Sequence, residues 1–397
     1  MDITIYPSKL SGAMQIIPSK SQAHRILICA AFADEETEII CPETNADISA
    51  TADCLAALGA QIVRTESGYH VIPVRTIPDK AVLNCGESGS TLRFMLPIAG
   101  ALGVETTFLM AGRLPQRPLS PLEEEMERMG CKISRPTHNT LLCQGRMIPG
   151  AYTIDGGVSS QFITGLLFAL ILLNKTCTLE ITGNIESRPY IDMTLRALAL
   201  FGGKINDHLV SPSLPLKSPG KVVVEGDWSN GAFFLAANAL GSSVRILGLR
   251  DDSPQGDRAC SSILTDEGPV YVSAADIPDL VPILSVAAAA RKGGIFTNIA
   301  RLRLKESDRV ASTIAMLAAL GIHAEADSNT LKIYPGVIHG GTVHSENDHR
   351  IAMSAAIAAT VADGPVTICG AECVSKSYPR FWEVYKALGG NYEQHIR

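Results

Sequence analysis

The sequence predicts an α/β (α+β) protein of two domains in which helices pack against sheets. Its 397 residues exceed what one ordinary hydrophobic core organises, so two domains of roughly 200 residues are expected. A short pattern of amphipathic helix, glycine and strand recurs along the chain, which indicates an internal repeat. Hydrophobic residues make up 46% of the chain and charged residues 19%, a composition that favours closely packed helices and sheets.

The repeat is carried by glycines that end helices. A residue just past the last helical turn often adopts the left-handed conformation, which glycine reaches without strain, and the chain then reverses into a strand. The five copies read AALGAQIV, ERMGCKIS, ALFGGKIN, AALGIHAEA and KALGGNYE, with the glycine at Gly59, Gly130, Gly202, Gly321 and Gly389. The long gap from Gly202 to Gly321 fits two shortened periods, with the missing helix end near residues 257–272. We therefore expect six repeat units, three in each domain.

Two segments mark where the chain passes between the domains. Residues 211–227, SPSLPLKSPGKVVVEGD, begin rich in Pro and Ser and continue as a β-branched strand, which favours an interdomain crossing. The first strand, ITIYPS, can pair with the second half of the chain if another crossing lies near Pro18. The predicted domains are therefore residues 19–224 and residues 1–18 together with 225–397.

Charge and composition exclude several classes of protein. The formal net charge of −6 argues against a basic surface for nucleic acid. The N-terminus MDITIYPSKL lacks the apolar core of a signal peptide, and the longest apolar run, residues 162–173, is too short to span a bilayer. The ten cysteines are scattered without a zinc-ligand spacing. We expect a cytoplasmic monomer that uses no metal or cofactor and has no nucleic-acid or membrane partner.

Candidate anion-binding residues stand at predicted helix starts in the first half. Lys20, in IPSKSQAHRI, opens a helical run, so its ammonium and the free backbone N–H groups can face one anion. A Gly/Ser turn at residues 86–90 also precedes a helix, but it is no Walker loop because no Lys follows its last glycine. Arg117 lies in the Pro-rich loop GRLPQRPLSPL. Two hydroxyls and an amide precede the apolar helix of VSSQFITGLL: Ser159, Ser160 and Gln161. Each feature alone could also be a helix cap or a solvated surface charge.

The second half holds denser charge clusters. Six charged side chains stand close together in RLRLKESDR: Arg301, Arg303, Lys305, Glu306, Asp308 and Arg309. A salt-bridge network at a helix start would also account for them, because the helix macrodipole favours carboxylates there. Arg350, in NDHRIAM, precedes a long apolar helix, and Lys376, in KSYP, lies between serines.

The pattern as a whole predicts a site for anions. No Ser/His/Asp or Cys/His nucleophile set and no dinucleotide fingerprint is evident. Cationic patches at helix starts in both halves, with a few carboxylates, indicate a cleft between the domains that binds two anionic substrates. Positioning and charge neutralisation would then supply most of the catalysis.

These stretches, in this order, resemble the 5-enolpyruvylshikimate-3-phosphate synthase family. The resemblance covers about residues 15–385 and rests on Lys-Ser with Arg25, SSQF, SRPYIDMTL, RLKESDR, NDHRIAM and KSYP. It implies three βαβαββ units around a pseudo-threefold axis in each domain and an active site in the interdomain cleft. It also implies that the 5-hydroxyl of shikimate 3-phosphate adds to C2 of phosphoenolpyruvate, that C3 is protonated, and that phosphate is then lost without a cofactor or metal.

The resemblance assigns a role to individual residues. The implied shikimate 3-phosphate ligands are Lys20, Ser21, Arg25, Ser159, Ser160, Gln161, Ser187, Tyr190, Asp279 and Lys305. The implied phosphoenolpyruvate ligands are Lys20, Gly89, Arg117, Gln161, Arg309, Arg350 and Lys376. Asp279 would orient or deprotonate the 5-hydroxyl, and Glu306 or Lys20 would handle the proton at C3. Because these residues come from both domains, we expect the domains to close on shikimate 3-phosphate.

Four features depart from the family pattern. Pro18 replaces the usual glycine, Glu87 stands in the Gly/Ser turn, and Arg301 stands where an asparagine is common. An anionic Glu87 is unexpected there unless it pairs with a neighbouring arginine. The repeat unit between Asp257 and Asp276 is abbreviated.

Three alternatives remain to be compared. The related transferase acting on UDP-N-acetylglucosamine typically has Asn after the first lysine and a reactive Cys in a mobile loop, whereas here Ser21 follows Lys20 and GRLPQRPL has no Cys. A non-catalytic anion-binding relative would have lost Lys20, Asp279, Glu306 or Lys376, and all are present. A cyclase-like RNA-end enzyme is disfavoured by the acidic balance and the missing nucleotide motif.

Overall fold

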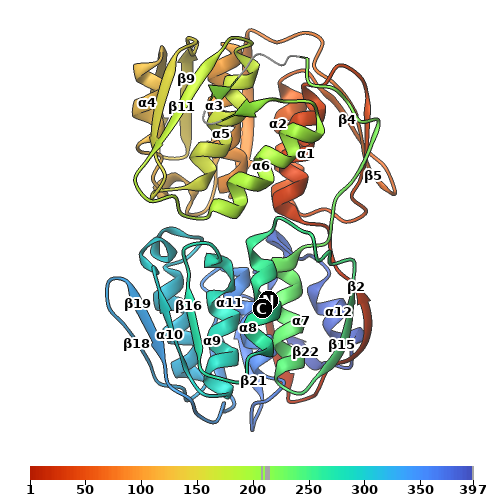
Figure 1. The fold of residues 1–397 in the computed structure, drawn as a ribbon. Coiled ribbons are helices and arrows are strands. Elements are labelled where there is room, and N and C mark those ends of the chain that lie inside the picture. Colours follow the sequence, from red (N-terminus) through yellow and green to blue (C-terminus); the bar gives the residue numbers. More distant parts are fainter. Residues whose placement is uncertain (207–208, 211–214, 396–397) are drawn as a thin grey trace. The chain divides into compact units, whose positions relative to one another are not determined.

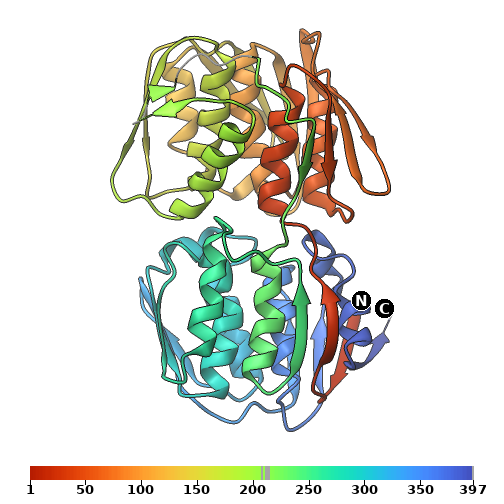
Figure 2. The same ribbon diagram turned by 45° about the vertical axis from the view of Figure 1, so that its right-hand side comes forward.

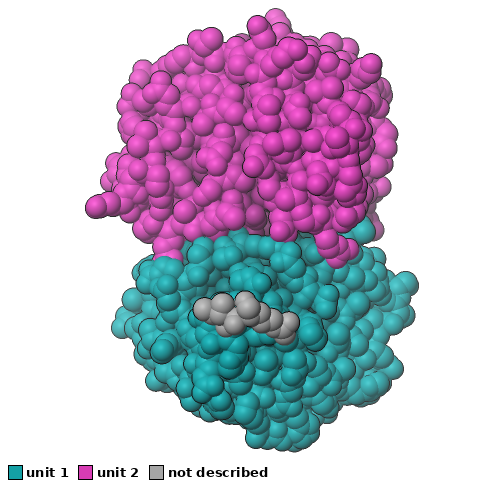
Figure 3. Space-filling model, turned by 180° about the vertical axis from the view of Figure 1, so that it is seen from behind, with its two compact units in different colours: residues 1–17, 225–397 teal, residues 18–224 magenta. Residues whose placement is uncertain are grey.

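The structure is a computed structural model that describes residues 1–206, 209–210 and 215–395. The chain divides into two compact units, coloured separately in Figure 3. Unit 1 is Met1–Ile17 with Glu225–Arg397, and unit 2 is Pro18–Val224. The chain therefore changes units after Ile17 and after Val224. Part of the second predicted crossing, residues 211–214, lies outside the described residues.

Unit 2 contains three four-stranded sheets of identical strand order. In each sheet the first two strands are parallel and the others are antiparallel. The strands in spatial order are β14 (Lys221–Val223), β3 (Thr37–Ile40), β5 (Gly68–Ile72) and β4 (Gln61–Arg64); β6 (Lys80–Gly86), β7 (Glu105–Met110), β9 (Thr140–Gly145) and β8 (Cys131–Thr137); and β10 (Ala151–Asp155), β11 (Cys177–Thr182), β13 (Leu209–Val210) and β12 (Ile205–Asn206).

Two helices accompany each of these sheets. They are α1 (Lys20–Ala31) and α2 (Ala46–Ala57), α3 (Gly89–Leu102) and α4 (Leu122–Arg128), and α5 (Ser160–Leu172) and α6 (Arg188–Leu200), with a short 3-10 helix, η1 (Leu114–Gln116), before α4. Along the chain, β6-α3-β7-α4-β8-β9 is a complete βαβαββ unit. The repeat that contains α1 takes its first strand, β14, from the C-terminal end of unit 2.

Unit 1 repeats this plan with one shortened copy. Its sheets are β16 (Val270–Ser273), β17 (Gly294–Thr297), β19 (Thr330–Ile333) and β18 (Ala324–Ala326); β20 (Gly341–His344), β21 (Val366–Cys369), β1 (Asp2–Tyr6) and β22 (Asn391–His395); and the two-stranded pair β15 (Ser243–Leu247) and β2 (Ser11–Gln15). The first strand pairs with β21 and β22, which confirms that the N-terminus joins the second half of the chain.

The helices of unit 1 occupy equivalent positions. They are α7 (Trp228–Ala239), α8 (Cys260–Thr265), α9 (Val281–Ala290), α10 (Arg309–Ala319), α11 (His349–Ala358) and α12 (Phe381–Ala387), with the 3-10 helices η2 (Gly256–Ala259), η3 (Pro278–Leu280), η4 (Ala300–Leu304) and η5 (Ala371–Lys376). Figures 1 and 2 show these helices running side by side within the unit, with strands on the outside. The predicted α/β (α+β) fold of repeated βαβαββ units is therefore correct.

The first helix of each repeat is the buried one. All residues of α11 and all but one of α9 are buried, whereas α10 and α6 bury only one face. A helix that is apolar all round must lie inside a core, while an amphipathic helix covers its surface. Each unit accordingly has its own hydrophobic core.

The predicted glycines do end helices. Gly59, Gly130, Gly202, Gly321 and Gly389 have φ between +76° and +107°, and each follows the second helix of its repeat. The missing sixth helix end was correctly expected near residues 257–272, where α8 ends at Thr265. Gly103 and Gly241, which were not predicted, have the same left-handed backbone after the first helices α3 and α7.

Candidate active site

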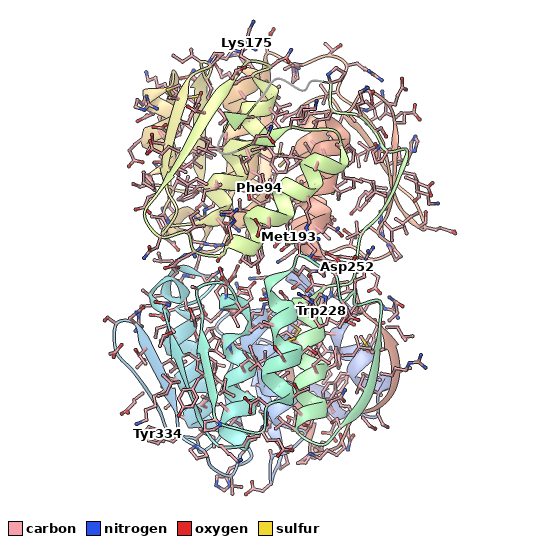
Figure 4. All side chains as sticks on the ribbon, viewed as in Figure 1. Phe94, Lys175, Met193, Trp228, Asp252 and Tyr334 are labelled. Atoms are coloured by element: carbon pink, nitrogen blue, oxygen red, sulfur yellow. The ribbon has the colours of Figure 1, made fainter. Side chains whose placement is uncertain are left out.

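Helix starts lie next to each other within unit 1. Arg350, at the start of α11, donates a hydrogen bond from Nη1 to the carbonyl oxygen of Ser229 in α7 at 3.1 Å. Arg309, at the start of α10, donates to Asp279 just before α9 at 2.8 Å. Figure 4 shows Trp228, the first residue of α7, at the opposite end of the unit from Tyr334. Free N–H groups and the positive ends of four macrodipoles make this end of the unit suitable for anions.

Arg309 is the centre of the charge cluster in unit 1. Its side chain is 1% exposed and donates to Asp279 Oδ1 at 2.8 Å, to Glu306 Oε2 at 2.6 Å and to Asp348 Oδ2 at 3.0 Å. Burial lowers the pKa of Arg309, but the three carboxylates raise it by more, so its pKa lies above the ordinary value. One buried guanidinium thus holds together the two carboxylates that the sequence predicts as the acid/base pair.

Asp279 is shared among three cations. It accepts from Arg309 on Oδ1, and Arg350 Nη2 lies 3.3 Å from its Oδ2. Lys305 Nζ lies 3.6 Å from Oδ1. Burial lowers the pKa of Lys305, and the negative charge of Asp279 only partly offsets this effect. The Asp279 carboxylate is therefore fixed in orientation by its neighbours.

Asp348 anchors the start of α11. It is fully buried, its Oδ1 accepts from the backbone N–H of Arg350 at 2.9 Å, and its Oδ2 accepts from Ser307 Oγ at 3.0 Å. This is an N-cap, so the same carboxylate orients Arg309 and stabilises the helix that carries Arg350. Lys376 Nζ donates to the carbonyl oxygen of Asn347 at 3.1 Å, which places it beside the same turn.

Unit 2 gathers helix starts in the same way. Lys20 is the first residue of α1, and its Nζ lies 2.9 Å from Asp47 Oδ2 in the first turn of α2. Both side chains are less than one-fifth exposed, at 18% and 19%. Asp47 was not predicted as a site residue, because an acidic residue after the N-cap Asn45 is an ordinary way to stabilise a helix start.

Two arginines flank the glycine turn that begins α3. A Cβ added at Gly89 would lie 2.6 Å from Nη1 of both Arg93 and Arg117, so both guanidinium groups approach the same backbone. Arg93 is buried and also donates to the carbonyl oxygen of Pro118 at 3.0 Å. Paired guanidinium groups suit a ligand with a carboxylate or phosphate. Glu87, the unexpected acid of this turn, lies against Gly112.

The start of α5 is joined to α3. Gln161 Nε2 donates to Ser90 Oγ at 2.9 Å. Ser159 is the N-cap of α5, and its Oγ accepts from the backbone N–H of Gln161 at 3.3 Å. Ser160 follows as the first helical residue and is buried. Of the two predicted hydroxyl residues, Ser159 therefore caps the helix and Ser160 is buried in its first turn.

The start of α6 contains a strained residue. Ser187 has φ +57°, a left-handed conformation that is uncommon outside glycine and frequent at functional sites. Tyr190, three residues later, accepts on its carbonyl oxygen from Arg25 Nη2 at 2.9 Å. Arg25 is buried, which lowers its pKa to about 10, and it also donates to the carbonyl oxygen of Ser21 at 2.6 Å. Arg25 thereby ties the start of α1 to the start of α6.

The predicted site residues are distributed over both units. Unit 2 contains Lys20, Ser21, Arg25, Gly89, Arg117, Ser159, Ser160, Gln161, Ser187 and Tyr190, and unit 1 contains Asp279, Lys305, Glu306, Arg309, Arg350 and Lys376. Arg301 lies half-buried in η4, and Pro18 begins unit 2. Within each unit, hydrogen bonds and ion pairs join most of these residues through neighbouring helix starts.

Across the residues that the structure describes, no cluster of three or more His, Cys, Asp or Glu side chains is arranged to hold a metal ion. In the same part of the chain, no helix combines the length and apolar character needed to cross a membrane.

Comparison with known proteins identifies close relatives. The family model described as EPSP synthase (3-phosphoshikimate 1-carboxyvinyltransferase) matches residues 5–274 and 261–385. A 3-phosphoshikimate 1-carboxyvinyltransferase of Clostridium perfringens is 39% identical over 98% of both chains, and one of Clostridium beijerinckii is 36% identical over 99% of this chain and 98% of the relative.

Solved structures show the same fold. An EPSP synthase from Acinetobacter baumannii superposes with a TM-score of 0.79 at 21% identity, covering all of both chains. The enolpyruvyl transferase NikO from Streptomyces tendae gives a TM-score of 0.76 at 18% identity, covering 100% of this chain and 99% of that one.

Proposed function

The chain belongs to the EPSP synthase (3-phosphoshikimate 1-carboxyvinyltransferase) family, and on this basis we propose how its residues carry out enolpyruvyl transfer. This reaction of the shikimate pathway moves the enolpyruvyl group of phosphoenolpyruvate to the 5-hydroxyl of shikimate 3-phosphate. The hydroxyl oxygen bonds to C2 while C3 takes a proton, which gives a tetrahedral intermediate. That intermediate then loses phosphate from C2 and a proton from C3. The Arg309 cluster, which joins two candidate acid/base carboxylates, is the observation that supports the residue roles most strongly.

Phosphoenolpyruvate is held by cations and by free backbone N–H groups. Its proposed ligands are Lys20, Gly89, Arg117 and Gln161 of unit 2 and Arg309, Arg350 and Lys376 of unit 1. Its carboxylate and phosphate match the paired guanidinium groups at Gly89 and the cation cluster around Asp279. Charge-assisted hydrogen bonds to both ends would fix the position of C2 and C3.

Shikimate 3-phosphate is held mainly by hydroxyls and lysines at helix starts. Its proposed ligands are Lys20, Ser21, Arg25, Ser159, Ser160, Gln161, Ser187 and Tyr190 of unit 2 and Asp279 and Lys305 of unit 1. Arg25 already donates to the backbone at Ser21 and Tyr190, so its contribution includes holding these two residues in position.

The acid/base work falls to three residues. Asp279, fixed by three cations, orients the 5-hydroxyl and accepts its proton, while Glu306 or Lys20 delivers and removes the proton at C3. Asp47 Oδ2 lies 2.9 Å from Lys20 Nζ and is therefore placed to hold the ammonium group in position.

Carboxylates contact several of the cations that are proposed to bind the substrate anions. Asp279 contacts Arg309 and Arg350, and Asp47 contacts Lys20. These contacts keep buried cations satisfied before binding. We propose that each substrate anion binds by displacing or sharing such a carboxylate.

Phosphate release from phosphoenolpyruvate tests this function. We expect phosphate with shikimate 3-phosphate as acceptor and none with UDP-N-acetylglucosamine. Lys20→Ala should lower kcat by about 10²- to 10⁴-fold, because a proton donor and an anion ligand are lost together. Lys175→Ala is the matched control, because Lys175 is an exposed lysine of the same unit. Figure 4 shows Lys175 at the opposite end of unit 2 from Met193, which lies in the first half of α6. Equal turnover with both acceptors, or near-native activity of Lys20→Ala, would contradict the assignment.

We also propose that the enzyme works as a monomer in the cytoplasm. Each unit has a complete hydrophobic core, and all proposed ligands come from one chain. Light scattering on the active protein should give the mass of a single chain.

A further inference from the structure

A buried carboxyl group that the proposed mechanism does not use lies behind the unit 1 cluster. Asp257 belongs to η2, in the shortened repeat, and is 2% exposed. Ser229 Oγ donates a hydrogen bond to Asp257 Oδ2. Among the described residues, no group hydrogen-bonds to Asp257 Oδ1. A carboxyl group this deeply buried with half of its acceptors unused calls for an explanation.

Asp257 is linked to Arg350 through Ser229. The hydroxyl of Ser229 donates to Asp257, and its backbone carbonyl oxygen accepts from Arg350 Nη1 at 3.1 Å. The other end of the same guanidinium lies 3.3 Å from Asp279 Oδ2. Arg350 is itself buried, so nearby charges act on it with little screening by water.

Charged and titratable groups surround Asp257 from four neighbouring elements. They are Asp227 at the start of α7, Asp279 in η3, Arg350 in α11 and the thiol of Cys260 in α8. Burial, and then the charge of Asp279, raise the pKa of Asp257 to about 7, while Arg350 and the Ser229 hydroxyl oppose the rise. Asp257 therefore exchanges its proton near neutral pH.

We propose that Asp257 is a positioning residue that sets how much of the positive charge of Arg350 is available to phosphoenolpyruvate. This rests on the proposed role of Arg350 as a phosphoenolpyruvate ligand. With Asp257 protonated, the charge of Arg350 is offset by Asp279 and Asp227 but not by Asp257. With Asp257 ionised, one more carboxylate acts on the same guanidinium, and binding of an anionic substrate becomes weaker.

The pH dependence of KM tests this proposal. For the full-length enzyme, KM for phosphoenolpyruvate should rise about five- to tenfold between pH 6 and pH 8.5, a size expected of one added charge at a partly screened site. Asp257→Asn cannot ionise, so its KM should stay near the low-pH value. Because the substrate titrates identically in both assays, the ratio of the two KM values isolates the protein group.

Two further variants sharpen the test. Asp252→Asn is the matched control, since Asp252 is 72% exposed in a nearby loop and pairs with Arg250 (Figure 4), and it should follow the wild-type profile. Ser229→Ala removes the hydroxyl that favours ionised Asp257 but keeps the carbonyl oxygen that Arg350 uses. It should therefore move the rise in KM to higher pH.

Three results would overturn the proposal. They are the same KM profile for Asp257→Asn and wild type, a change in KM for shikimate 3-phosphate of equal size, and an unchanged or lower midpoint for Ser229→Ala. The midpoint measured for Ser229→Ala tests the proposal even if Asp257→Asn does not fold. These results differ from a failure of the proposed function, in which the wild-type protein itself would release no phosphate from phosphoenolpyruvate.

Discussion

At the scale of single residues, the unit 1 site is a balance of buried charges. Arg309, Arg350 and Lys305 face the carboxylates of Asp279, Glu306 and Asp348, so cations and anions are equal in number within this cluster. Removing one member leaves an uncompensated buried charge, which costs more than the pair contributes. We therefore expect substitution of any one of these charged residues by a neutral one to lower the free energy of unfolding of unit 1.

Gly89→Ala should weaken phosphoenolpyruvate binding while leaving the fold intact. The added Cβ would lie 2.6 Å from Nη1 of Arg93 and of Arg117, and these flexible ends can move away. We therefore expect KM for phosphoenolpyruvate to rise about tenfold, the effect of losing one charge-assisted hydrogen bond of about 1.4 kcal/mol, with little change in melting temperature.

The matched control for this substitution is Gly364→Ala. Its added Cβ would meet its nearest neighbour at 3.5 Å, an ordinary contact. An unchanged KM for Gly89→Ala would contradict the proposed roles of Gly89 and Arg117 in phosphoenolpyruvate binding.

At the scale of elements, hydrogen-bonded side chains hold helix starts together. His24 Nδ1 lies 2.7 Å from Thr51 Oγ1, which lies 2.7 Å from Thr91 Oγ1, which donates to Ser88 Oγ at 2.7 Å. This chain joins α1, α2 and the N-cap of α3. Burial, with smaller effects from Lys20 and Arg25, holds the pKa of His24 well below its ordinary value, so the chain stays neutral. The Gly89 turn is therefore positioned by the interior of unit 2.

Arg93→Lys tests the link between two elements of unit 2. Arg93 donates to the carbonyl oxygens of Gly89 and Pro118, which ties the start of α3 to the loop that carries Arg117. A single ammonium cannot reproduce both contacts, because it lacks the planar fork of a guanidinium. We expect a loss of about 1–2 kcal/mol in the free energy of unfolding and a several-fold rise in KM for phosphoenolpyruvate.

Arg75→Lys provides the comparison for this variant. Arg75 is exposed and donates to one carbonyl oxygen, that of Asp34. Its substitution should therefore change neither the free energy of unfolding nor KM for phosphoenolpyruvate. Equal effects of the two substitutions would mean that Arg93 has no special positioning role.

At the scale of the whole molecule, the proposed ligands are divided between two units that each fold around their own core. We expect shikimate 3-phosphate to change the small-angle scattering profile toward a smaller radius of gyration, because residues of both units are proposed to contact it. Shikimate without the phosphate is the control ligand and should leave the profile closer to that of the free protein. Superimposable profiles with and without shikimate 3-phosphate would contradict domain closure.

Features that depend on a few neighbouring residues could be predicted from the sequence. The N-cap Ser159 accepts from a backbone N–H group two residues away, and glycines such as Gly59 end helices through their own backbone freedom. The shortened repeat was correctly located for the same reason, since a missing helix end is a local absence in the pattern.

Which of these local features come into contact depends on how the whole chain packs. Asp47 contacts Lys20 across 27 positions of sequence, and the Ser229 hydroxyl reaches Asp257 across 28, although each residue looks like an ordinary helix-start or loop residue by itself. The pairing of β14 with β3 likewise joins segments from opposite ends of unit 2. The repeat and the helix ends could thus be predicted because they depend on short-range geometry, and the family could be predicted because its motifs recur in order along the chain. The charge pairings arise only when packed helices bring distant segments within a few ångströms, where burial strengthens their interaction.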